Sequence, residues 1–587
     1  MNSSAARREL GAVAIFFAAA AAVWSWPLVG ALTHSIPGDL GDPLLLLCLT
    51  DWVRHTLFSA PAHVWNAPFF HPNPAVLTFS DPFFGQALAT WPAGWFTQNP
   101  VLPYNLAFLE GGIASALAAY ALARACGSGI AGGLVAGLAF GFGPFATTQM
   151  SHMQMQWNAF LPLSLLAAVR ARETGRWPAY LAMSAALFLQ SLFALYTAVI
   201  AIYAVAAFWC FALWADGWRR DRLFRLAVSS AVLGLALSPV ILPFHFAHQA
   251  YGFFRSPYDA KGGSADLLDF LQAPVFTRMW AWLPDALVNT RGGEHAIGSG
   301  WIPLGLALVG VRYCLRDRGK PAAFLPWLLL YGWVMALGPR LHIAGHEASF
   351  GRYTVFGHHW SLLVNLPYAL LFYALPGLDG LRVVLRFAVA ADLAIAVMAG
   401  LVITRLLERI PISATRLRRA AGIAAVSLCA CESWVGGMTL ATPPQGDSGE
   451  AVYRWIALQP AGGAVVELPL PSFQGGEGGK YHELLYVYRQ RLHRHRILNG
   501  LSGHFPPDYD ALCSIGGGFP SSASIAYFRS RGARYVIVHE GAREWAKLPP
   551  VRIPDYMVLE APIVHRSGSD FVFDLGPASA IPRTGAR

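Results

Sequence analysis

The sequence predicts a polytopic α-helical membrane protein that carries a small C-terminal α/β domain. Of its 587 residues, 55% are hydrophobic and only 13% are charged, about half of the roughly 25% usual for soluble domains. Apolar runs of about 17 to 25 residues recur along the chain, each long enough to cross about 30 Å of hydrocarbon. After about residue 443 the composition becomes that of a soluble segment. A water-soluble globule and a disordered chain are both excluded.

About eleven membrane crossings are predicted. The first follows Arg7 and Arg8, as a signal peptide would. It has over 20 apolar residues and ends in Trp24, Trp26 and Pro27 rather than in a small-residue cleavage motif, so we expect an uncleaved span. The predicted spans lie near 10–32, 101–125, 129–146, 157–172, 178–193, 195–215, 224–245, 300–316, 321–338, 384–407 and 419–437.

The connecting segments alternate in charge. The short stretches 1–9, 123–128, 170–178, 216–226, 312–320 and 405–420 together carry 19 Lys/Arg and 6 Asp/Glu in 60 residues. The alternating stretches 33–100, 146–156, 246–299 and 339–383 carry 8 Lys/Arg and 11 Asp/Glu in 178 residues. Because positive residues favour the cytoplasmic side, the first set is predicted to be cytoplasmic and the second to face outward. The excess positive charge, +10 net, is thus explained by the orientation of the protein in the membrane. No nucleic-acid partner is expected.

Two further apolar stretches, 82–97 and 361–376, break this alternation if they are counted as spans. The first contains Pro92 and Trp95 and the second contains Pro367 and Pro376, and we expect both to be interfacial or re-entrant segments on the outer face. If only one of them crosses the membrane, the C-terminus changes sides.

The C-terminal segment reads as helices alternating with strands. Segment 449–459 has helical spacing, 463–470 is strand-like, 521–531 is again helical and 534–539 is a second strand. This order favours a small α/β domain. We therefore predict a transmembrane domain over 1–443, which includes the first outer loop 33–100, and an extracytoplasmic α/β domain over 444–587.

The first outer loop carries the strongest candidate for chemistry. Asp39 and Asp42 lie three residues apart beside Gly and Pro, directly before an amphipathic helix predicted over 44–58. At the membrane surface such carboxylates are placed to meet a lipid-linked substrate, and a general base needs an acceptor atom of this kind near the reacting hydroxyl. The competing interpretation is that both residues only cap turns and the start of the helix.

Other outer segments combine aromatic with polar side chains, a combination that can stack on sugar rings and bind their hydroxyls. His71 and Asp81 lie among aromatic residues of the first loop, and His152 and Gln154 lie at the mouth of a later span. We take these four as candidate substrate-binding residues. An interfacial aromatic belt explains the same pattern.

Arginines at the outer ends of later spans are candidate phosphate ligands. Arg382 and Arg386 are four residues apart, so on a helix they share a face and could clamp a phosphate. Arg340 is a weaker candidate of the same kind. Snorkelling of the arginines to lipid headgroups is the alternative.

Three carboxylates, Glu110, Asp392 and Glu432, fall within predicted spans, where such groups are often functional but also partner between helices. The spacing of the His, Cys, Asp and Glu residues is not typical of metal ligands, and the sequence implies neither a metal nor a cofactor.

Several segments together resemble a known superfamily. They are IPGDLGDPLLLL, WNAPFFHPNPAVLTFSDPFFG, NPVLPYNL, SHMQMQWNAFLPL, SADLLDFLQAP, LPGLDGLRVVLRFA, VVELPLP and LNGLSGHFPPDYDAL. With the Arg-flanked first span and the acidic first loop, they resemble a bacterial, largely uncharacterised branch of the GT-C superfamily, whose members are polytopic glycosyltransferases that use polyprenyl-phosphate sugars. The similarity spans nearly the whole chain.

This resemblance implies an inverting glycosyltransferase of the bacterial inner membrane and cell envelope, surrounded by membrane lipids. The donor would be a polyprenyl-phosphate sugar, and the acceptor, a glycan, lipid or protein, is left open. The superfamily places its catalytic carboxylate in the first extracytoplasmic loop, which here falls on Asp39 or Asp42. Basic residues that hold its donor phosphate lie at outer ends of later spans, a position shared by Arg340, Arg382 and Arg386.

Two other readings stay open. A transporter or lipid flippase would use midplane charges such as Asp392, although the sequence lacks the matched halves typical of many transporters. A catalytically inactive relative could bind glycolipid as an assembly factor.

Overall fold

The computed structural model describes residues 3–274, 276–289, 293–355, 358–446, 450–470, 477–540 and 561–576. The chain divides into two compact units. Unit 1 comprises Met1–Leu32, Asn105–Val240 and Phe254–Thr439, and unit 2 comprises Thr33–Tyr104, Ile241–Phe253 and Leu440–Arg587. The first loop therefore clusters with the C-terminal segment, whereas the sequence grouped it with the membrane helices.

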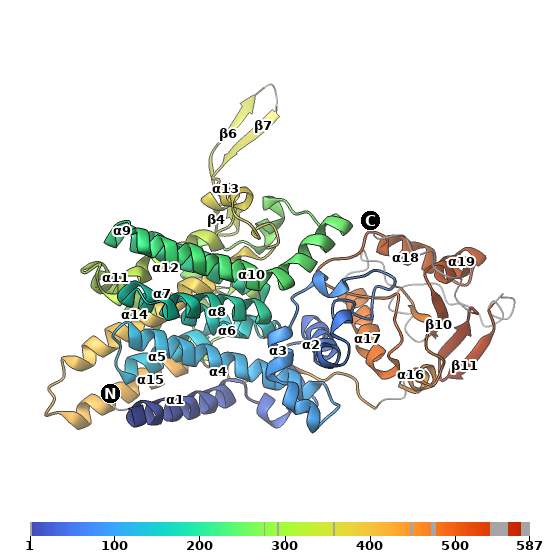
Figure 1. Cartoon of the computed structure of the whole chain (residues 1–587), viewed down its shortest axis with the longest axis horizontal. Coiled ribbons are helices and arrows are strands. Elements are labelled where there is room, and N and C mark those ends of the chain that lie inside the picture. The colour runs from blue at the N-terminus through green and yellow to red at the C-terminus, as the bar shows by residue number, and fades with distance from the viewer. Residues whose placement is uncertain are drawn as a thin grey trace. The chain divides into compact units, whose positions relative to one another are not determined.

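Unit 1 is a helical bundle (Figure 1). The helices that lie wholly or mostly in it are α1 Ser3–Trp24, α4 Val101–Ala125, α5 Ile130–Gly141, α6 Pro144–Thr148, α7 Phe160–Thr174, α8 Trp177–Phe193, α9 Leu195–Asp216, α10 Arg220–Tyr251, α11 Trp301–Leu315, α12 Leu325–Ala336, α13 Pro367–Ala374, α14 Ala388–Glu408 and α15 Thr415–Ser433.

Each of the eleven predicted spans falls on a helix. Within the described residues, five helical segments are long and apolar enough to cross a membrane: Val101–Ala125, Ile130–Thr148, Leu195–Asp216, Arg220–Tyr251 and Val384–Glu408. Three shorter apolar helices are Trp177–Phe193, Trp301–Leu315 and Pro321–Ala336. The protein is thus a helical membrane protein.

Helix α14 is the centre of the bundle. It is apolar on all sides, and the hydrophobic window within Val384–Glu408 is 94% buried, as expected for a helix surrounded by other helices. Glycines allow α5 to approach its backbone: a Cβ at Gly132 would lie 2.1 Å from the carbonyl oxygen of Gly400, and one at Gly400 would lie 2.3 Å from that of Gly132. Small residues of this kind let membrane helices pack closely.

The two stretches that break the charge alternation form only short helices. Segment 82–97 contains the six-residue α3 Phe84–Ala89 and a 3-10 helix, Trp91–Trp95. Segment 361–376 contains the eight-residue α13. A crossing needs about 20 helical residues, so neither forms a helix of that length.

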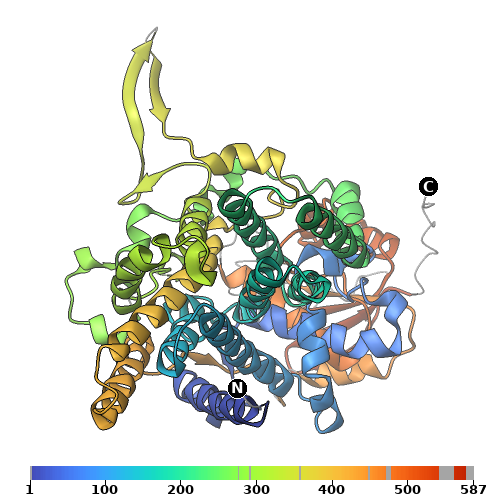
Figure 2. The same ribbon diagram turned by 60° about the vertical axis from the view of Figure 1, so that its left-hand side comes forward.

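Within its described residues, unit 1 also contains three short pairs of strands. Hairpin β6–β7 projects away from the helices of this unit (Figure 2). The strands are β2 Ala273–Pro274, β3 Val288–Asn289, β4 His342–Ile343, β5 His346–Glu347, β6 Ser349–Val355 and β7 His358–Leu363.

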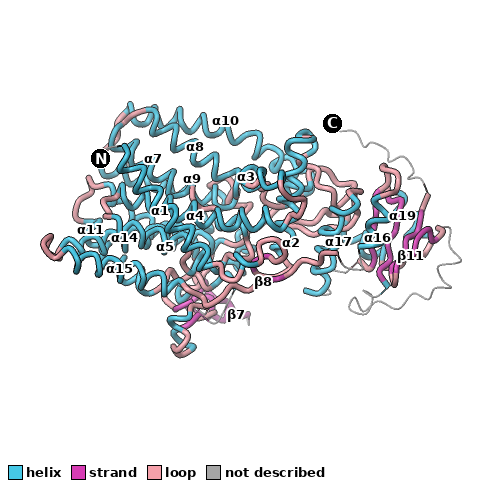
Figure 3. Tube along the Cα trace, turned by 90° about the horizontal axis from the view of Figure 1, so that it is seen from below, coloured by secondary structure: helices cyan, strands magenta, loops and turns pink. Residues whose placement is uncertain are grey.

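Unit 2 contains a four-stranded sheet, whose strands lie beside α16 and α19 in Figure 3. Its order is β11-β12-β10-β9, with β9 parallel to β10 and the other pairs antiparallel. Strand β9 is buried at every position, as expected for a strand covered on both faces. The elements are α16 Glu450–Ala457, β9 Ala464–Leu468, α17 Glu477–His493, α18 Tyr509–Gly516, α19 Ser522–Ser530, β10 Ala533–His539, β11 Ile563–Ser567 and β12 Asp570–Asp574.

Backbone pairing joins the first loop to the C-terminal segment within unit 2. Strand β1 Ile36–Pro37 pairs with β8 Leu440–Ala441, and the backbone N–H groups of Phe70 and His71 donate to the carbonyl oxygens of Asn499 and Ile497 at 2.9 Å each. Helix α2 Asp42–Ser59 follows β1. It confirms the helix predicted over 44–58, and it begins two residues earlier than predicted.

Candidate functional site

Asp39 and Asp42 lie at the junction of β1 and α2, and both are exposed. Asp39 Oδ1 accepts the backbone N–H of Gly41 at 2.7 Å, a bond that closes the turn. Asp42 is the first residue of α2 and precedes Pro43. A carboxylate in the first helical turn is stabilised by the helix dipole. The turn therefore engages one oxygen of Asp39, and the start of the helix fixes the backbone of Asp42.

A residue that the sequence reasoning missed lies beside this pair. Tyr104 is 1% exposed, and the negative charges of Asp42 and Asp39 act on its phenol group. Its hydroxyl oxygen has no hydrogen-bond partner among the described residues. The only sequence signal was its position in NPVLPYNL at the start of α4.

His71 and Asp81 are both half-buried in unit 2. Burial, with the charges of Arg496 and Arg531, lowers the pKa of His71 to about 4, so its ring is neutral at physiological pH. Asp81 follows a 3-10 helix, Val76–Phe79, and precedes α3.

In unit 1, Arg386 binds a carboxylate that the sequence reasoning did not single out. Its Nε and Nη2 donate to Glu294 Oε2 and Oε1 at 2.7 and 2.9 Å. Gln149 Nε2 donates to Oε2 at 2.9 Å, and His152 Nε2 lies 3.9 Å from Oε1. The guanidinium also lies over the ring of Tyr196, 5.0 Å from its centre. The structure thus brings together two of the candidates, Arg386 and His152, around one oxyanion.

The charges of this group favour an ionised oxyanion at its centre. Burial alone would raise the pKa of Glu294, but Arg386, His152 and the amide of Gln149 outweigh it and lower the pKa to about 2. The carboxyl side chain is 23% exposed, whereas that of Arg386 is 8% exposed. The guanidinium of Arg386 is therefore buried, and the carboxylate that it binds is partly accessible. The only sequence signal for Glu294 was an acidic residue in an outer loop.

The expectation that Arg382 and Arg386 share one helical face is wrong. Arg382 lies before the helix, in a bend, and regular structure begins only with the 3-10 helix Val384–Phe387. Arg382 is exposed instead, and together with burial its charge lowers the pKa of Arg255. Gly377 and Gly380 precede it, and a glycine-rich turn is a poor helix former.

Arg340 belongs to a separate group in unit 1. Its Nη1 lies 3.3 Å from both carboxylate oxygens of Glu347, and its guanidinium lies 4.6 Å from the ring centre of Tyr258. Lys261 contacts the same carboxylate at 2.6 Å.

Gln154 is 6% exposed in the 3-10 helix Met153–Gln156. Its amide oxygen has no hydrogen-bond partner among the described residues.

Of the three carboxylates in predicted spans, two have partners. Glu432 Oε1 accepts the backbone N–H of Trp301 at 2.7 Å and the indole N–H of Trp280 at 2.8 Å, so it caps α11. Asp392 accepts the hydroxyl of Ser299. Glu110 is half-buried.

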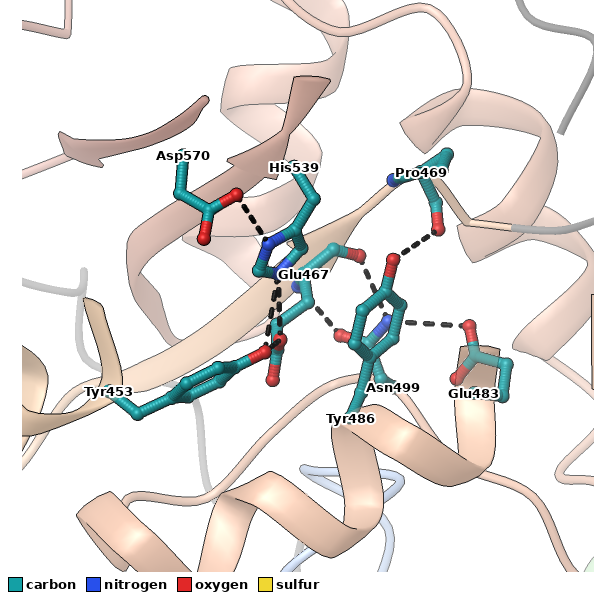
Figure 4. Close-up of polar contacts among 8 residues, drawn as sticks. All are labelled: Tyr453, Glu467, Pro469, Glu483, Tyr486, Asn499, His539 and Asp570. Atoms are coloured by element: carbon teal, nitrogen blue, oxygen red, sulfur yellow. Dashed lines mark hydrogen bonds and ion pairs between the residues drawn. The ribbon is translucent and has the colours of Figure 1, made fainter. Parts of the chain in front are cut away.

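A buried polar network crosses the sheet of unit 2 (Figure 4). His539 lies between two carboxylates, with Nδ1 3.0 Å from Asp570 and Nε2 3.1 Å from Glu467. The hydroxyl of Tyr453 donates to Glu467 Oε2 at 2.6 Å. Burial opposes a charged ring, but the bonds to the two carboxylates outweigh it and raise the pKa of His539 to about 9. The network therefore contains an internal ion pair.

The network continues through Asn499. Its Oδ1 accepts the backbone N–H of Glu467 at 2.7 Å, and its Nδ2 lies 3.3 Å from Glu483 Oε1. Burial raises the pKa of Glu483 to about 8. In the described part of the chain, no group of three His, Cys, Asp or Glu side chains is suited to hold a metal ion.

Comparison with known proteins finds similarity in structure only. No protein-family model matches the sequence, and no curated protein matches it. Among solved structures, arabinofuranosyltransferase AftD from Mycobacteria aligns over 97% of this chain and 40% of its own, with 14% identity and a TM-score of 0.56. ArnT from Cupriavidus metallidurans aligns over 96% of this chain and 98% of its own, with 13% identity and a TM-score of 0.48.

The oligosaccharyltransferase AglB from Archaeoglobus fulgidus aligns over 92% of this chain and 70% of its own, with 14% identity and a TM-score of 0.45. This chain spans less than half the length of AftD. These neighbours are GT-C glycosyltransferases. The match to AftD over nearly the whole chain confirms one part of the predicted fold class: this chain has a GT-C-like fold.

Proposed function

We propose that this chain is an inverting glycosyltransferase of the bacterial inner membrane that transfers a sugar from a polyprenyl-phosphate donor to an acceptor outside the cytoplasm. The observation that carries the proposal is the exposed Asp39–Asp42 pair at the start of α2, in the first loop of a chain with the GT-C fold. The AftD similarity supports sugar transfer as the reaction. The lipid-linked donor is what the resemblance of the sequence to the GT-C superfamily implies.

In the proposed reaction Asp42 accepts the proton of an acceptor hydroxyl, and the hydroxyl oxygen attacks the anomeric carbon. The bond between that carbon and the phosphate oxygen breaks with inversion, and the polyprenyl phosphate leaves. A general base of this kind contributes about 10² to 10⁴ in rate. Asp42 is preferred to Asp39 because it directly precedes Pro43 at the start of α2, which fixes its position, whereas Asp39 lies in the preceding turn.

The leaving phosphate develops charge, and fixed donors stabilise it best. Arg386, Arg382 and Arg340 are the proposed phosphate ligands. Arg386 has the strongest support of the three, because Arg386 and Gln149 form a cradle of donors around the carboxylate of Glu294. We propose that two oxygens of the donor phosphate bind in this cradle in place of the two carboxylate oxygens. His71, Asp81, His152 and Gln154 are proposed to contact the sugars.

Transfer from a panel of radiolabelled polyprenyl-phosphate sugars in reconstituted membranes tests the proposal. Asp42→Asn keeps the size and polarity of the side chain but cannot accept the proton, so the rate should fall by about 10² to 10⁴ while donor binding and thermal stability stay near wild type. Asp39→Asn should be milder. Asp510→Asn, at an exposed aspartate of the same unit, is the matched control and should be silent.

If wild type transfers sugar and Asp42→Asn keeps most of that activity, Asp42 is not the base. If Asp39→Asn alone is inactive, the base is Asp39. Donor binding without transfer by any member of the panel would favour a glycolipid-binding assembly factor.

The proposed orientation has its own test. Eleven crossings from a cytoplasmic N-terminus place residues 443–587 outside. A reporter that is active only outside the cytoplasm, fused after Arg587, should be active. A stably inserted but inactive fusion would mean that 82–97 or 361–376 crosses the membrane.

A further inference from the structure

Unit 2 contains a cavity of about 270 Å³ between α2 and α17. Its α2 wall is one face of that helix, because positions 48, 52, 55 and 59 recur every three or four residues. The opposite wall is the end of α17 and the residue that follows it. The lining residues that carry polar or aromatic groups and enter the argument below are Asp51, Trp52, His55, Ser59, Arg491 and Arg494.

The acidic residue of the cavity is already neutralised within α2. Asp51 Oδ1 accepts from Arg54 Nη2 at 2.8 Å and lies 3.3 Å from His55 Nδ1. Arg54 is buried, with 5% of its side chain exposed. The hydrogen bond to Asp51 also raises the pKa of His55. The negative charge of Asp51 is therefore matched by its own helix, and the two arginines of the other wall leave the cavity with an excess of positive charge.

The arginines retain capacity for a ligand. Arg491 Nη2 donates to the hydroxyl of Tyr488 at 3.0 Å, and its guanidinium lies 4.4 Å from the centre of that ring. Its Nε is buried and has no hydrogen-bond partner among the described residues. Arg494 has a φ of 58°, a backbone conformation that is uncommon outside glycine and tends to occur at functional sites.

An aromatic ring of fixed orientation completes the lining. The indole N–H of Trp52 donates to the carbonyl oxygen of Val64 at 2.9 Å. Because its polar atom is engaged, Trp52 offers an apolar ring face, against which the C–H face of a sugar can pack. Ser59, whose hydroxyl donates to the carbonyl oxygen of His55 at 2.7 Å, is exposed at the end of the same helix face.

We propose that this cavity binds a sugar residue that carries a carboxylate or a phosphate. Arg491 and Arg494 bind the anionic group, and Trp52 packs against the ring. Guanidinium groups suit both anions because they present paired donors. A helix rises about 1.5 Å per residue, so Asp51 lies about 13 Å along α2 from Asp42. The identification of the sugar as part of the acceptor glycan, several bonds away from the hydroxyl that reacts, rests on the proposed function.

The proposal is tested by equilibrium binding of sugars to the full-length Asp42→Asn protein in nanodiscs. This variant is expected not to transfer sugar, so binding is measured without turnover. The probes are a tetrasaccharide of alternating glucuronate and N-acetylglucosamine, the neutral N-acetylglucosamine tetrasaccharide, glucose 6-phosphate and inorganic phosphate. We expect one or both anionic sugars to bind at least tenfold more tightly than the neutral sugar and inorganic phosphate. The choice between glucuronate and glucose 6-phosphate identifies the anionic group.

Two variants test the location. R491Q/R494Q should weaken binding of the preferred anionic sugar at least tenfold. Ser59→Trp should do the same by filling the cavity while it leaves both arginines in place. Arg496→Gln, at an exposed arginine two residues after Arg494, is the matched control and should bind as the parent does.

Equal binding of charged and neutral tetrasaccharides, with no preference for glucose 6-phosphate over inorganic phosphate, would overturn the proposal. So would anionic-sugar affinity that both R491Q/R494Q and Ser59→Trp leave unchanged. Neither result depends on sugar transfer, so a failure of the transferase proposal remains distinguishable. If binding follows the expectation but Asp42→Asn is as active as wild type, the proposed binding of an anionic sugar in the cavity is supported and the assignment of Asp42 as the base is wrong.

Discussion

Two carboxylate–cation pairs, one in each unit, differ in what surrounds them. In unit 2, Glu467 has no exposed surface and His539 is 9% exposed, and strands β9, β10 and β12 supply the partners. In unit 1, Glu294 is 23% exposed and lies in the short 3-10 helix Gly293–His295, while its donors come from separate elements. The same kind of interaction is thus enclosed in a sheet in one place and partly open in the other. We expect the enclosed pair to matter for the stability of the sheet, and we propose that in the open pair an anionic ligand can replace the carboxylate.

The largest expected effect is on the enclosed pair. His539→Leu leaves the buried Glu467 and the half-buried Asp570 without their cation, and removal of one partner of a buried pair costs about 3–5 kcal/mol. Amide hydrogen exchange of β9 and β10 in the full chain should show a fall of this size in the free energy of opening. His565→Leu, on β11 at the other edge of the sheet from β9, is the control. Unchanged protection in His539→Leu would show that the pair does not stabilise the sheet.

The contribution of His539 to the pH dependence of the same strands should be slightly smaller than the effect of removing it. The folded pKa of His539 is about 9, above its ordinary value of 6.5, so its contribution is complete below pH 6.5 and is lost as the pH rises to 9. Glu483, raised from 4.5 to about 8, acts in the same direction between those values. A loss of about 3 kcal/mol between pH 6.5 and 9 is expected from His539.

Protection of β9 and β10 at the two pH values, corrected for intrinsic exchange, measures this loss. His539→Gln should remove the part of the slope above pH 8. Stability that instead rises with pH would assign His539 the opposite sign.

Substitutions in the open pair, Arg386 and Glu294, should change the affinity of the protein for its sugar donor. Arg386→Gln removes a charge-assisted contact, so affinity for a polyprenyl-phosphate sugar should fall by about 1.5–3 kcal/mol, or about 10- to 150-fold. Glu294→Gln removes the carboxylate that competes with the phosphate, so affinity should rise. Arg382→Gln should have a smaller effect than Arg386→Gln because Arg382 lies outside the cradle. If both Arg386→Gln and Glu294→Gln weaken binding, or neither changes it, the pair is structural like its counterpart in unit 2.

The smallest effect is expected at Gln149. Its amide donates to the same oxyanion, and Gln149→Met removes one hydrogen bond worth about 1 kcal/mol. Donor affinity, measured by titration in nanodiscs, should fall about fivefold. Gln190→Met, at a buried glutamine whose amide donates to Trp157 and Thr197, is a control for the loss of a buried amide. Equal effects at the two positions would contradict a direct role for Gln149.

Much of the fold could be predicted because its signals are local. Runs such as 195–215 and 384–407 are apolar over the length of a span, and each became a helix. The alternation of helix and strand after residue 443 likewise predicted α16, β9, α19 and β10. Helical spacing failed at Arg382, where Gly377 and Gly380 keep the chain out of the helix that the i,i+4 pattern suggested.

The site was harder to predict because its contacts are distant in sequence. Glu294 and Arg386 are separated by 92 residues, and Gln149 and Glu294 by 145. No spacing rule connects such positions, so the sequence offered Arg386 and His152 as separate candidates and did not offer Glu294. The Asp39–Asp42 pair was visible because both residues lie in one short turn.

The pairing of β1 with β8 bears on how the protein is made. Ser35, beside β1, bonds the hydroxyl of Thr442, which is 407 residues later in the chain. At synthesis rates of about 5–20 residues per second, Thr442 is made about 20 to 80 s after Ser35. The turn that carries Asp39 and Asp42 therefore acquires its strand partner only when the helices that precede Thr442 in the chain have been synthesised. An unfinished chain cannot form this pairing, so the aspartate turn lacks its strand partner until residue 442 has been synthesised.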